Sequence, residues 1–200
     1  MAKSYGLDIS HWQGIVDWTN IPLSFVFIKC GGGDAGYYTD LQFKNNKAGA
    51  RKKGLITGYY WFAGHNDPVA EADKFVDTVG DIAQGELLAL DAETGQSPLW
   101  CLKFLQEVEK KVGFKPLIYA PVGNGWDWSP VYKNNNGLWV ARYGLNTGGV
   151  PMIFTPKIGP WTFYVVWQYT SRGRVQGING LVDLDLCNCD LAVLKKYGKN

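Results

Sequence analysis

The sequence has no apolar run close to the length of a membrane span, which takes about 20 consecutive apolar residues. Its first residues, Met1-Ala2-Lys3-Ser4, also lack the apolar region of a secretory signal. We therefore expect a protein that is synthesised in the cytoplasm without a signal peptide and that does not insert into a membrane.

A strong charge of one sign is also missing. Twenty basic and 18 acidic residues leave a formal net charge of +2 and a pI near 8.2, whereas nucleic-acid-binding domains usually have a pI above about 9 and a clustered basic face. Short basic runs at 51–53, 110–111 and 195–196 fall near the ends of predicted helices, where cations complement the helix dipole. We expect no nucleic-acid partner, although the slight positive balance suits a polyanionic bacterial wall.

Cysteine and histidine are scarce. The cysteines, at positions 30, 101, 187 and 189, are too few and too irregularly spaced for a disulfide framework. Cys187-Asn188-Cys189 lacks the C-x-x-C spacing of metal ligands, and the two histidines, His11 and His65, are far away in the sequence. We expect no metal, no cofactor, and reduced, partly buried thiols.

Aromatic residues, in contrast, are abundant at 14% of the sequence. Flat aromatic faces are what proteins offer to sugars or to bases. The overall composition, with 46% hydrophobic residues (the aromatic ones included) and 19% charged residues, is typical of a globular protein. We expect one domain over residues 1–200.

Residues 86–93, Glu-Leu-Leu-Ala-Leu-Asp-Ala-Glu, combine an apolar run with two carboxylates. The run predicts a parallel strand covered on both faces, and side chains two apart in a strand point the same way. Asp91 and Glu93 should lie together where this strand ends, with split pKa values, as acid/base pairs do. The alternative is that both cap the next helix and face water.

Three further acids fall in predicted apolar strands. Asp8 lies between Leu7 and Ile9, and Asp183 and Asp185 share one face of a strand over 181–186. Charged side chains are almost never buried without a partner. Each of these acids is therefore either paired structurally or part of a site at a strand end.

Apolar runs and alternating apolar patterns predict eight strands, over residues 5–10, 25–30, 56–63, 86–93, 117–120, 138–143, 163–170 and 181–186. Helices are predicted from a capping box at 39–42, after Asp67, after Ser97 and from 190 to 197, with an irregular stretch over 144–160. The ten-residue loop 171–180 is too short for a parallel crossover.

This pattern predicts an α/β fold, an irregular TIM-like β/α barrel of about eight strands. Helices should follow mainly the earlier strands, and the last strands should be antiparallel. Chemistry in such barrels lies at the carboxyl ends of the strands. Alternation along 56–63 sends Tyr60 and Phe62 to one face, where they can line a cleft beside Asp91 and Glu93.

Four motifs occur in order along the chain: Gly6-Leu-Asp8-Ile-Ser-His-Trp-Gln-Gly14, Phe25-Val-Phe-Ile-Lys29, Leu90-Asp91-Ala-Glu93, and Trp167-Gln-Tyr-Thr-Ser171 through Gly177-Ile with Val182-Asp183-Leu. Together they strongly resemble the Chalaropsis-type lysozymes, glycoside hydrolase family 25. The resemblance implies a modified β/α barrel that cleaves the β-1,4 bond between N-acetylmuramic acid and N-acetylglucosamine in peptidoglycan.

The resemblance also implies roles. Glu93 matches the family's general acid, Asp91 the assisting carboxylate, and Asp8 and Asp183 two further acids of the cleft. The positions expected to bind the sugar are Tyr60, Phe62, Tyr119, Trp139 and Gln168. We further expect that the charge of Asp91 raises the pKa of Glu93, and that backbone hydrogen bonds keep Asp91 ionised.

The sequence departs from the family pattern at three places. Cys30-Gly-Gly-Gly33 replaces the frequent Ala-Thr-Glu-Gly, and Trp61 replaces a frequent His, so that subsite preference is open. Asp185 replaces the commoner Asn, and we interpret it as a structural acid.

The expected absence of an export signal fits a phage lysin that acts on the bacterial wall after release through a separate holin-type pore. Many such lysins carry a wall-binding module, and the 200-residue sequence contains none that we can identify. Two other interpretations remain: a non-catalytic carbohydrate-binding protein on the same scaffold, and a glycosidase acting on chitin. Clustered carboxylates favour an enzyme over a binding module.

Overall fold

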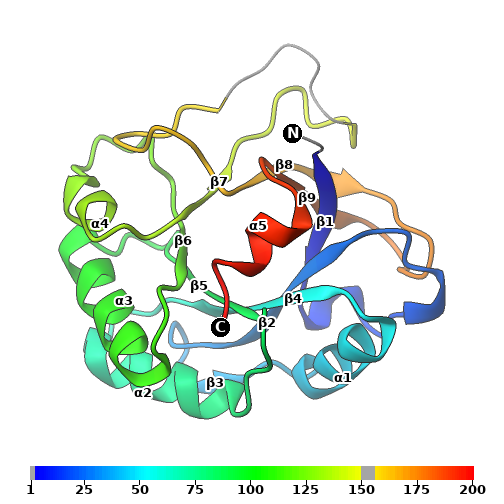
Figure 1. Ribbon diagram of the computed structural model, residues 1–200, viewed down its shortest axis with the longest axis horizontal. Helices are drawn as coiled ribbons and strands as arrows, with labels where there is room; N and C mark the ends of the chain where they lie inside the picture. The colour runs from blue at the N-terminus through cyan, green and yellow to red at the C-terminus, as the bar shows by residue number, and fades with distance from the viewer. Residues whose placement is uncertain (1–2, 150–155) are drawn as a thin grey trace.

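The computed structural model describes residues 3–149 and 156–200. The strands in these residues are β1 (Ser4–Ile9), β2 (Phe25–Gly32), β3 (Tyr38–Thr39), β4 (Ile56–Phe62), β5 (Leu87–Asp91), β6 (Leu117–Tyr119), β7 (Leu138–Ala141), β8 (Val166–Gly173) and β9 (Val182–Cys187). They form one sheet in the order β1-β9-β8-β7-β6-β5-β4-β2-β3, and β2 also pairs with β1 (Figure 1). The sheet is therefore a closed barrel, to which β3 is added at the edge of β2.

The direction of the strands follows the prediction. β1 pairs with β2 in parallel, as do all neighbours from β2 through β4 to β8. β9 is antiparallel to both β8 and β1 and closes the barrel between them. This pairing confirms the predicted α/β barrel with antiparallel last strands. The physical reason is that the loop before β9 is too short for the crossover that a parallel strand would need.

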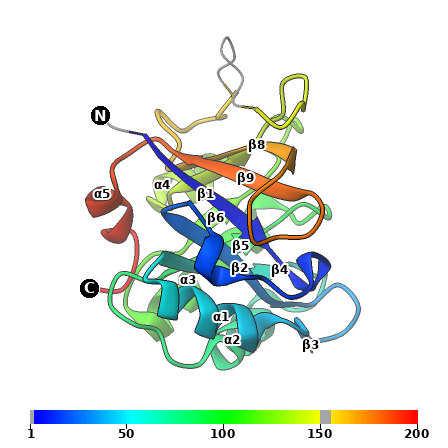
Figure 2. The same ribbon diagram turned by 90° about the vertical axis from the view of Figure 1, so that its right-hand side faces the viewer.

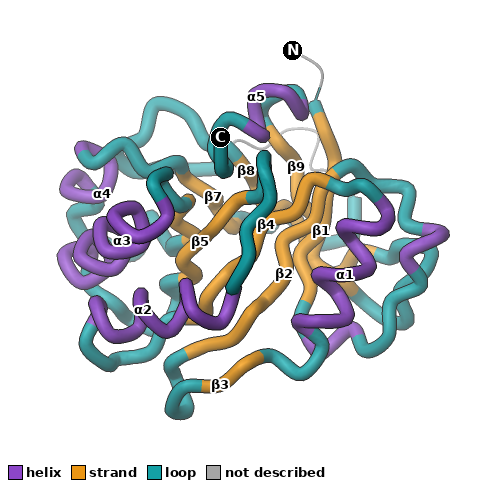
Figure 3. Tube along the Cα trace, turned by 60° about the horizontal axis from the view of Figure 1, so that its bottom comes forward, coloured by secondary structure: helices purple, strands orange, loops and turns teal. Residues whose placement is uncertain are grey.

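The helices are α1 (Phe43–Lys53), α2 (Pro68–Val79), α3 (Pro98–Val112), α4 (Ser129–Lys133) and α5 (Leu191–Lys195), with 3₁₀ turns η1 (His11–Gln13) and η2 (Trp18–Asn20). Figure 3 shows α1, α2 and α3 outside the barrel, following the earlier strands as predicted. The irregular segment predicted over 144–160 falls partly outside the described residues. Among the described residues, no helix is long and apolar enough to cross a bilayer.

The starts of two helices follow from their sequence. Asp67 caps α2 and Ser97 caps α3, each followed by proline, as predicted. The capping box predicted at 39–42 is wrong. Thr39 belongs to β3 and pairs with Gly31 of β2, and Asp40 accepts hydrogen bonds from the Gln42 and His11 amides, so that α1 begins only at Phe43.

Two apolar cores result, one between the helices and the outside of the barrel and one within it. Phe25 and Phe27 fill the interior because Gly6 and Gly58 leave space for their rings; a Cβ at either glycine would lie 2.3 Å from a ring carbon. Leu194 of α5 belongs to the inner core. α5 therefore covers one end of the barrel, on the side of the molecule opposite β3 (Figure 2).

The expectation of four reduced thiols is wrong for two of them. Cys187 and Cys189 form a disulfide. They lie at the end of β9, two residues apart and with a Cα–Cα distance of 5.2 Å, which a disulfide can span. Cys30 and Cys101 are free and buried, as expected.

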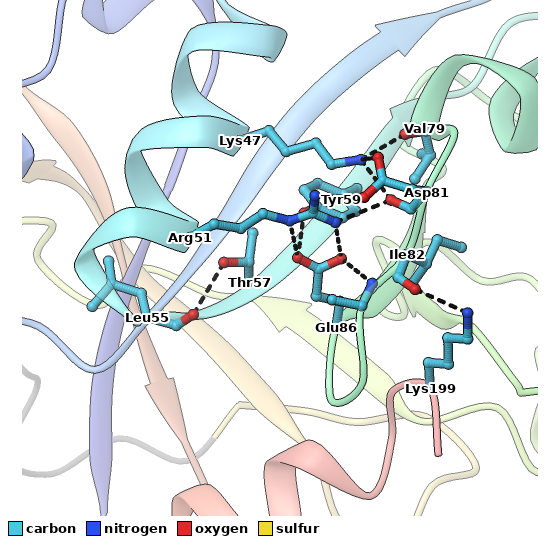
Figure 4. Close-up of polar contacts among 11 residues, drawn as sticks. Lys47, Arg51, Leu55, Thr57, Tyr59, Val79, Asp81, Ile82, Glu86 and Lys199 are labelled. Atoms are coloured by element: carbon cyan, nitrogen blue, oxygen red, sulfur yellow. Dashed lines mark hydrogen bonds and ion pairs between the residues drawn. The ribbon is translucent and has the colours of Figure 1, made fainter.

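A buried carboxylate at the start of β5 ties the strand to α1 (Figure 4). Glu86 accepts two hydrogen bonds from Arg51 at 2.6 and 2.7 Å, one from the Tyr59 hydroxyl at 2.6 Å and one from the Ala83 amide at 2.7 Å. Burial raises the pKa of Glu86, but these hydrogen bonds outweigh burial and lower it below its usual value.

Glu86→Gln should lower the free energy of unfolding by about 2 kcal/mol at pH 7, because it removes hydrogen bonds made to a charged group. A carboxyl group whose pKa is lower in the folded state than in the unfolded state stabilises the folded protein at pH values above the unfolded-state pKa. The difference in unfolding free energy between the parent and the variant should therefore shrink below about pH 4. Urea unfolding at several pH values measures this.

The matched control is Glu109→Gln, which removes a more exposed ion pair with Lys115. It should cost less than about 1 kcal/mol. Equal losses in the two variants would contradict a special role for the Glu86 network.

Candidate active site

A cavity of about 340 Å³ opens at the carboxyl ends of the parallel strands. Every site residue predicted from the sequence lines it. These residues are Asp8, Tyr60, Phe62, Asp91, Glu93, Tyr119, Trp139, Gln168 and Asp183. The strand pattern therefore brings together side chains that are up to 175 positions apart, from Asp8 to Asp183.

Strand register produces this convergence. Asp91 stands beside Phe62 of β4 and Tyr119 of β6, and Tyr119 stands beside Trp139 of β7. On the other side of the barrel, Asp8 of β1 lies directly opposite Asp183 of β9. Each pair shares one face of the sheet, the face toward the barrel interior.

Asp91 and Glu93 differ in their access to water. Asp91 is only 8% exposed, whereas Glu93 is exposed at the cavity. Burial and the charge of Glu93 raise the pKa of Asp91 well above its usual value, and burial raises the pKa of Glu93. Both side chains point into the cavity, as their spacing predicted.

The expectation that backbone hydrogen bonds keep Asp91 ionised is wrong. Its Oδ1 is buried and has no hydrogen-bond partner among the described residues. Burial without a hydrogen bond at this oxygen disfavours the ionised form of Asp91, which is the direction in which its pKa is shifted. The rise in the pKa of Glu93 also comes chiefly from burial rather than from Asp91.

The opposite wall of the cavity carries Asp8 and Asp183. Burial, followed by the charge of Glu93, raises the pKa of Asp183 to about 6. Burial also raises the pKa of Asp8, as do the charges of Asp185 and Asp183, while a hydrogen bond from Gln168 opposes this rise. The acids of the two walls therefore influence one another across the cavity.

Gln168 connects several of these groups. Its Nε2 donates to Asp8 Oδ2 at 2.7 Å, and its Oε1 accepts from the hydroxyls of Tyr119 at 3.1 Å and Tyr143 at 2.5 Å. The amide is thereby fixed in one orientation.

Trp139 forms the floor of the cavity. The residue is 2% exposed, and its ring stacks on that of Phe27 and meets that of Tyr119 edge to face, with ring centres 4.4 and 4.9 Å apart. Its indole N–H donates to Asp185 Oδ1 at 2.9 Å. Trp139 therefore offers a sugar little ring surface, and Asp185 lies beneath it, away from the cavity lining.

The sequence reasoning did not single out several lining residues. Lys29 and Tyr143 are the most informative: Lys29 Nζ lies 4.1 Å from the centre of the Phe62 ring, and its charge lowers the pKa of both Asp91 and Glu93. Trp12 and Gln13 contribute the rim. Lys29 and Tyr143 each lie two positions after an inward-facing residue, Phe27 and Ala141 respectively. Side chains two apart in a strand point to the same face, so this spacing could have identified both residues.

Within the described residues, no group of three or more His, Cys, Asp and Glu is arranged to hold a metal ion. What the cavity offers is carboxyl groups with raised pKa values, one lysine, and aromatic rings. A carboxyl pair in a polar cleft at the carboxyl ends of barrel strands is the arrangement that glycoside hydrolases use.

Comparison with known sequences identifies the family within this class. Residues 7–178 match the profile described as glycosyl hydrolases family 25. The chain belongs to this family and is an enzyme, a glycoside hydrolase, which confirms the resemblance seen in the four motifs.

Individual relatives agree with this assignment. Lysozyme M1 of Streptomyces globisporus is 30% identical, over 98% of this chain and 71% of its own length. The bacterial lysozyme from Streptomyces coelicolor superposes with a TM-score of 0.82 at 26% identity, covering 100% of this chain and 99% of that one. The catalytic domain of endolysin ply40 from bacteriophage P40 of Listeria monocytogenes gives a TM-score of 0.74 at 29% identity, covering 97% and 98%.

Lys29→Met should move both limbs of the pH–rate profile to higher pH by about one unit, because it removes the positive charge that lowers the pKa of Asp91 and Glu93. Turnover of bacterial walls measured across pH tests this. Lys29→Arg keeps the charge and should stay close to the parent. A folded Lys29→Met with both limbs in place would show that Lys29 does not tune the pair.

Proposed function

We propose that this enzyme is a peptidoglycan hydrolase that cleaves the β-1,4 bond between N-acetylmuramic acid and N-acetylglucosamine. The observation that carries the proposal is the exposed Glu93 beside the buried Asp91 at the end of β5, inside a cavity lined by two further acids. The lysozyme names of its relatives support the substrate.

Glu93 acts as the general acid and base. It is the member of the pair that a glycosidic oxygen can reach, and burial raises its pKa toward the protonated state that a proton donor needs. Lys29 limits this rise, which keeps the proton available for transfer. After donation, the Glu93 carboxylate can take a proton from the water that completes hydrolysis.

Asp91 assists from below. Its Oδ1 is buried, so Oδ2 is the oxygen that faces a bound sugar. That oxygen accepts the N–H of the substrate's acetamido group and fixes the group at the reacting carbon. A hydrogen bond from the substrate to Oδ2 would add a donor to a carboxyl group whose other oxygen has none.

Asp8 and Asp183 supply negative charge on the opposite wall. An oxocarbenium-like transition state carries positive charge on the sugar ring, and nearby carboxylates stabilise it. Tyr60, Phe62 and Tyr119 bound the space in which the ring lies, and Gln168 holds Asp8 in place.

We also propose that residues 1–200 act as one catalytic domain and that the enzyme is a phage lysin. Its likeness to the Listeria phage endolysin domain supports this role. In that setting the enzyme would reach the wall from the host cytoplasm through a separate holin-type pore.

Glu93→Gln should keep the fold and lower turnover by about 10²–10⁴-fold, because general acid catalysis is typically worth that much. Turbidity loss of bacterial walls measures turnover, and co-sedimentation with walls measures binding, which should persist. A glutamine of the same shape can donate a hydrogen bond but has no acidic proton to transfer to the leaving oxygen.

Asp91→Asn is the comparison variant for the Glu93 test. It should lower turnover less than Glu93→Gln does, because the amide oxygen of asparagine can still accept the acetamido N–H. If Glu93→Gln lyses walls near the parent rate and Asp91→Asn is inert, the two roles are exchanged. If neither substitution matters, the site is not catalytic.

The products identify the bond. Digested peptidoglycan, reduced with borohydride and hydrolysed, should contain reduced muramic acid as its new end group, and chitin should release few reducing ends under the same conditions. New ends made of reduced glucosamine, or faster release from chitin than from walls, would replace the muramidase proposal with a different glycosidase.

A further inference from the structure

Asp185 is an acid that the proposed chemistry does not use. It lies on β9, beside Gln168 of β8 and Gly6 of β1, and its side chain is 0% exposed beneath the cavity floor. Its Oδ1 accepts the Trp139 indole N–H. Its Oδ2 is buried, and no N–H or hydroxyl group among the described residues donates to it.

The carboxyl group of Asp8 lies on the same inward face of the neighbouring strand: Asp8 stands opposite Asp183 and Asp185 stands opposite Gly6, so that the two acids are diagonal neighbours across the β1–β9 pair. Two carboxylates have acceptors only, so they can hydrogen-bond to one another only when one of them carries a proton. Asp8 Oδ2 already accepts the Gln168 amide. One proton between Asp8 and Asp185 therefore satisfies an oxygen that otherwise has no partner.

We propose that Asp8 and Asp185 share a single proton, and that Asp185 is a positioning residue that holds Asp8 against the cavity wall. Trp139 fixes Asp185 from one side and Gln168 fixes Asp8 from the other. The pair carries one negative charge where two acids would otherwise carry two. The proposal deepens the function proposed above, in which Asp8 faces the sugar.

The surroundings favour such sharing. Burial raises the pKa of Asp185 to about 8, and burial followed by the Asp185 charge raises the pKa of Asp8. The titratable groups that act on the pair or feel its charge are Asp183, Asp91, Tyr60, Tyr119, Tyr143 and Tyr169. All are acids or phenols, so none offers a positive charge that would favour a second ionisation.

A pH dependence follows. Below about pH 8 the shared proton keeps the two carboxyl groups together. Above it the proton leaves, two buried charges repel, and Asp8 is released from Asp185. Turnover should therefore fall on the alkaline side through loss of this pair, in addition to any loss from Glu93.

The Trp139 indole N–H reports the charge of Asp185 directly, because it donates to Oδ1. Its ¹H–¹⁵N NMR signal, assigned by its disappearance in Trp139→Phe, should titrate with a midpoint near pH 8 in the parent protein. In Asp185→Asn that titration should be absent. This measurement needs no substrate, so it tests the shared proton even if the proposed function fails.

Asp185→Asn keeps an acceptor for Trp139 and provides an N–H for Asp8, while removing the proton that can be lost. The alkaline limb of wall lysis, normalised to each protein's own maximum, should move up by about one pH unit in this variant. Asp190→Asn is the control: the same change at an exposed cap of α5, outside the cavity, should move neither the limb nor the indole titration.

Two results would overturn the proposal. A Trp139 signal that stays constant between about pH 6 and 10 in the folded parent would show that no proton is shared. A titrating signal together with an unmoved alkaline limb in Asp185→Asn would show that the pair exists but does not position Asp8 for the reaction. Parent protein that lyses no walls but shows the titration would refute the function and leave the shared proton standing.

Discussion

The constraint on which this structure depends is the cost of holding acidic side chains together inside a barrel. Burial raises the pKa of Asp8, Asp91 and Asp183, and Lys29 is the one lysine or arginine among the described residues that line the cavity. The acids of the cavity repel one another when they are ionised, and on flexible segments this repulsion would move them apart. A closed sheet, in which β9 is bonded to both β8 and β1, keeps them in place.

Much of this arrangement was predictable from the sequence because it depends on local periodicity. An apolar run that ends in Asp-Ala-Glu defines β5 and sends Asp91 and Glu93 to one face, and alternation does the same for Tyr60 and Phe62. The carboxyl ends of parallel strands then converge. Residues from distant segments meet at one cavity for that reason. The prediction of the first strand was therefore sufficient to place Asp8 at the site.

What could not be predicted depends on partners that local patterns do not reveal. Asp40 looks like part of a helix cap, but η1 brings the His11 amide to it, and β3 takes Thr39 out of the helix. The disulfide between Cys187 and Cys189 depends on how β9 ends. Whether a donor reaches a buried oxygen is likewise decided by the packing of several strands rather than by sequence neighbours.

The two ends of β5 show how the same residue chemistry serves stability and reaction. Glu86, just before the strand, receives four hydrogen bonds and has a lowered pKa. Asp91, its last residue, has a buried oxygen without a donor and a raised pKa. A carboxylate that is fully bonded stabilises the fold but has nothing left to offer a substrate. The shortage of donors at Asp91 costs stability and raises the pKa of this carboxyl group, and it leaves Oδ2, the oxygen that faces the cavity, free to accept a hydrogen bond from a bound sugar.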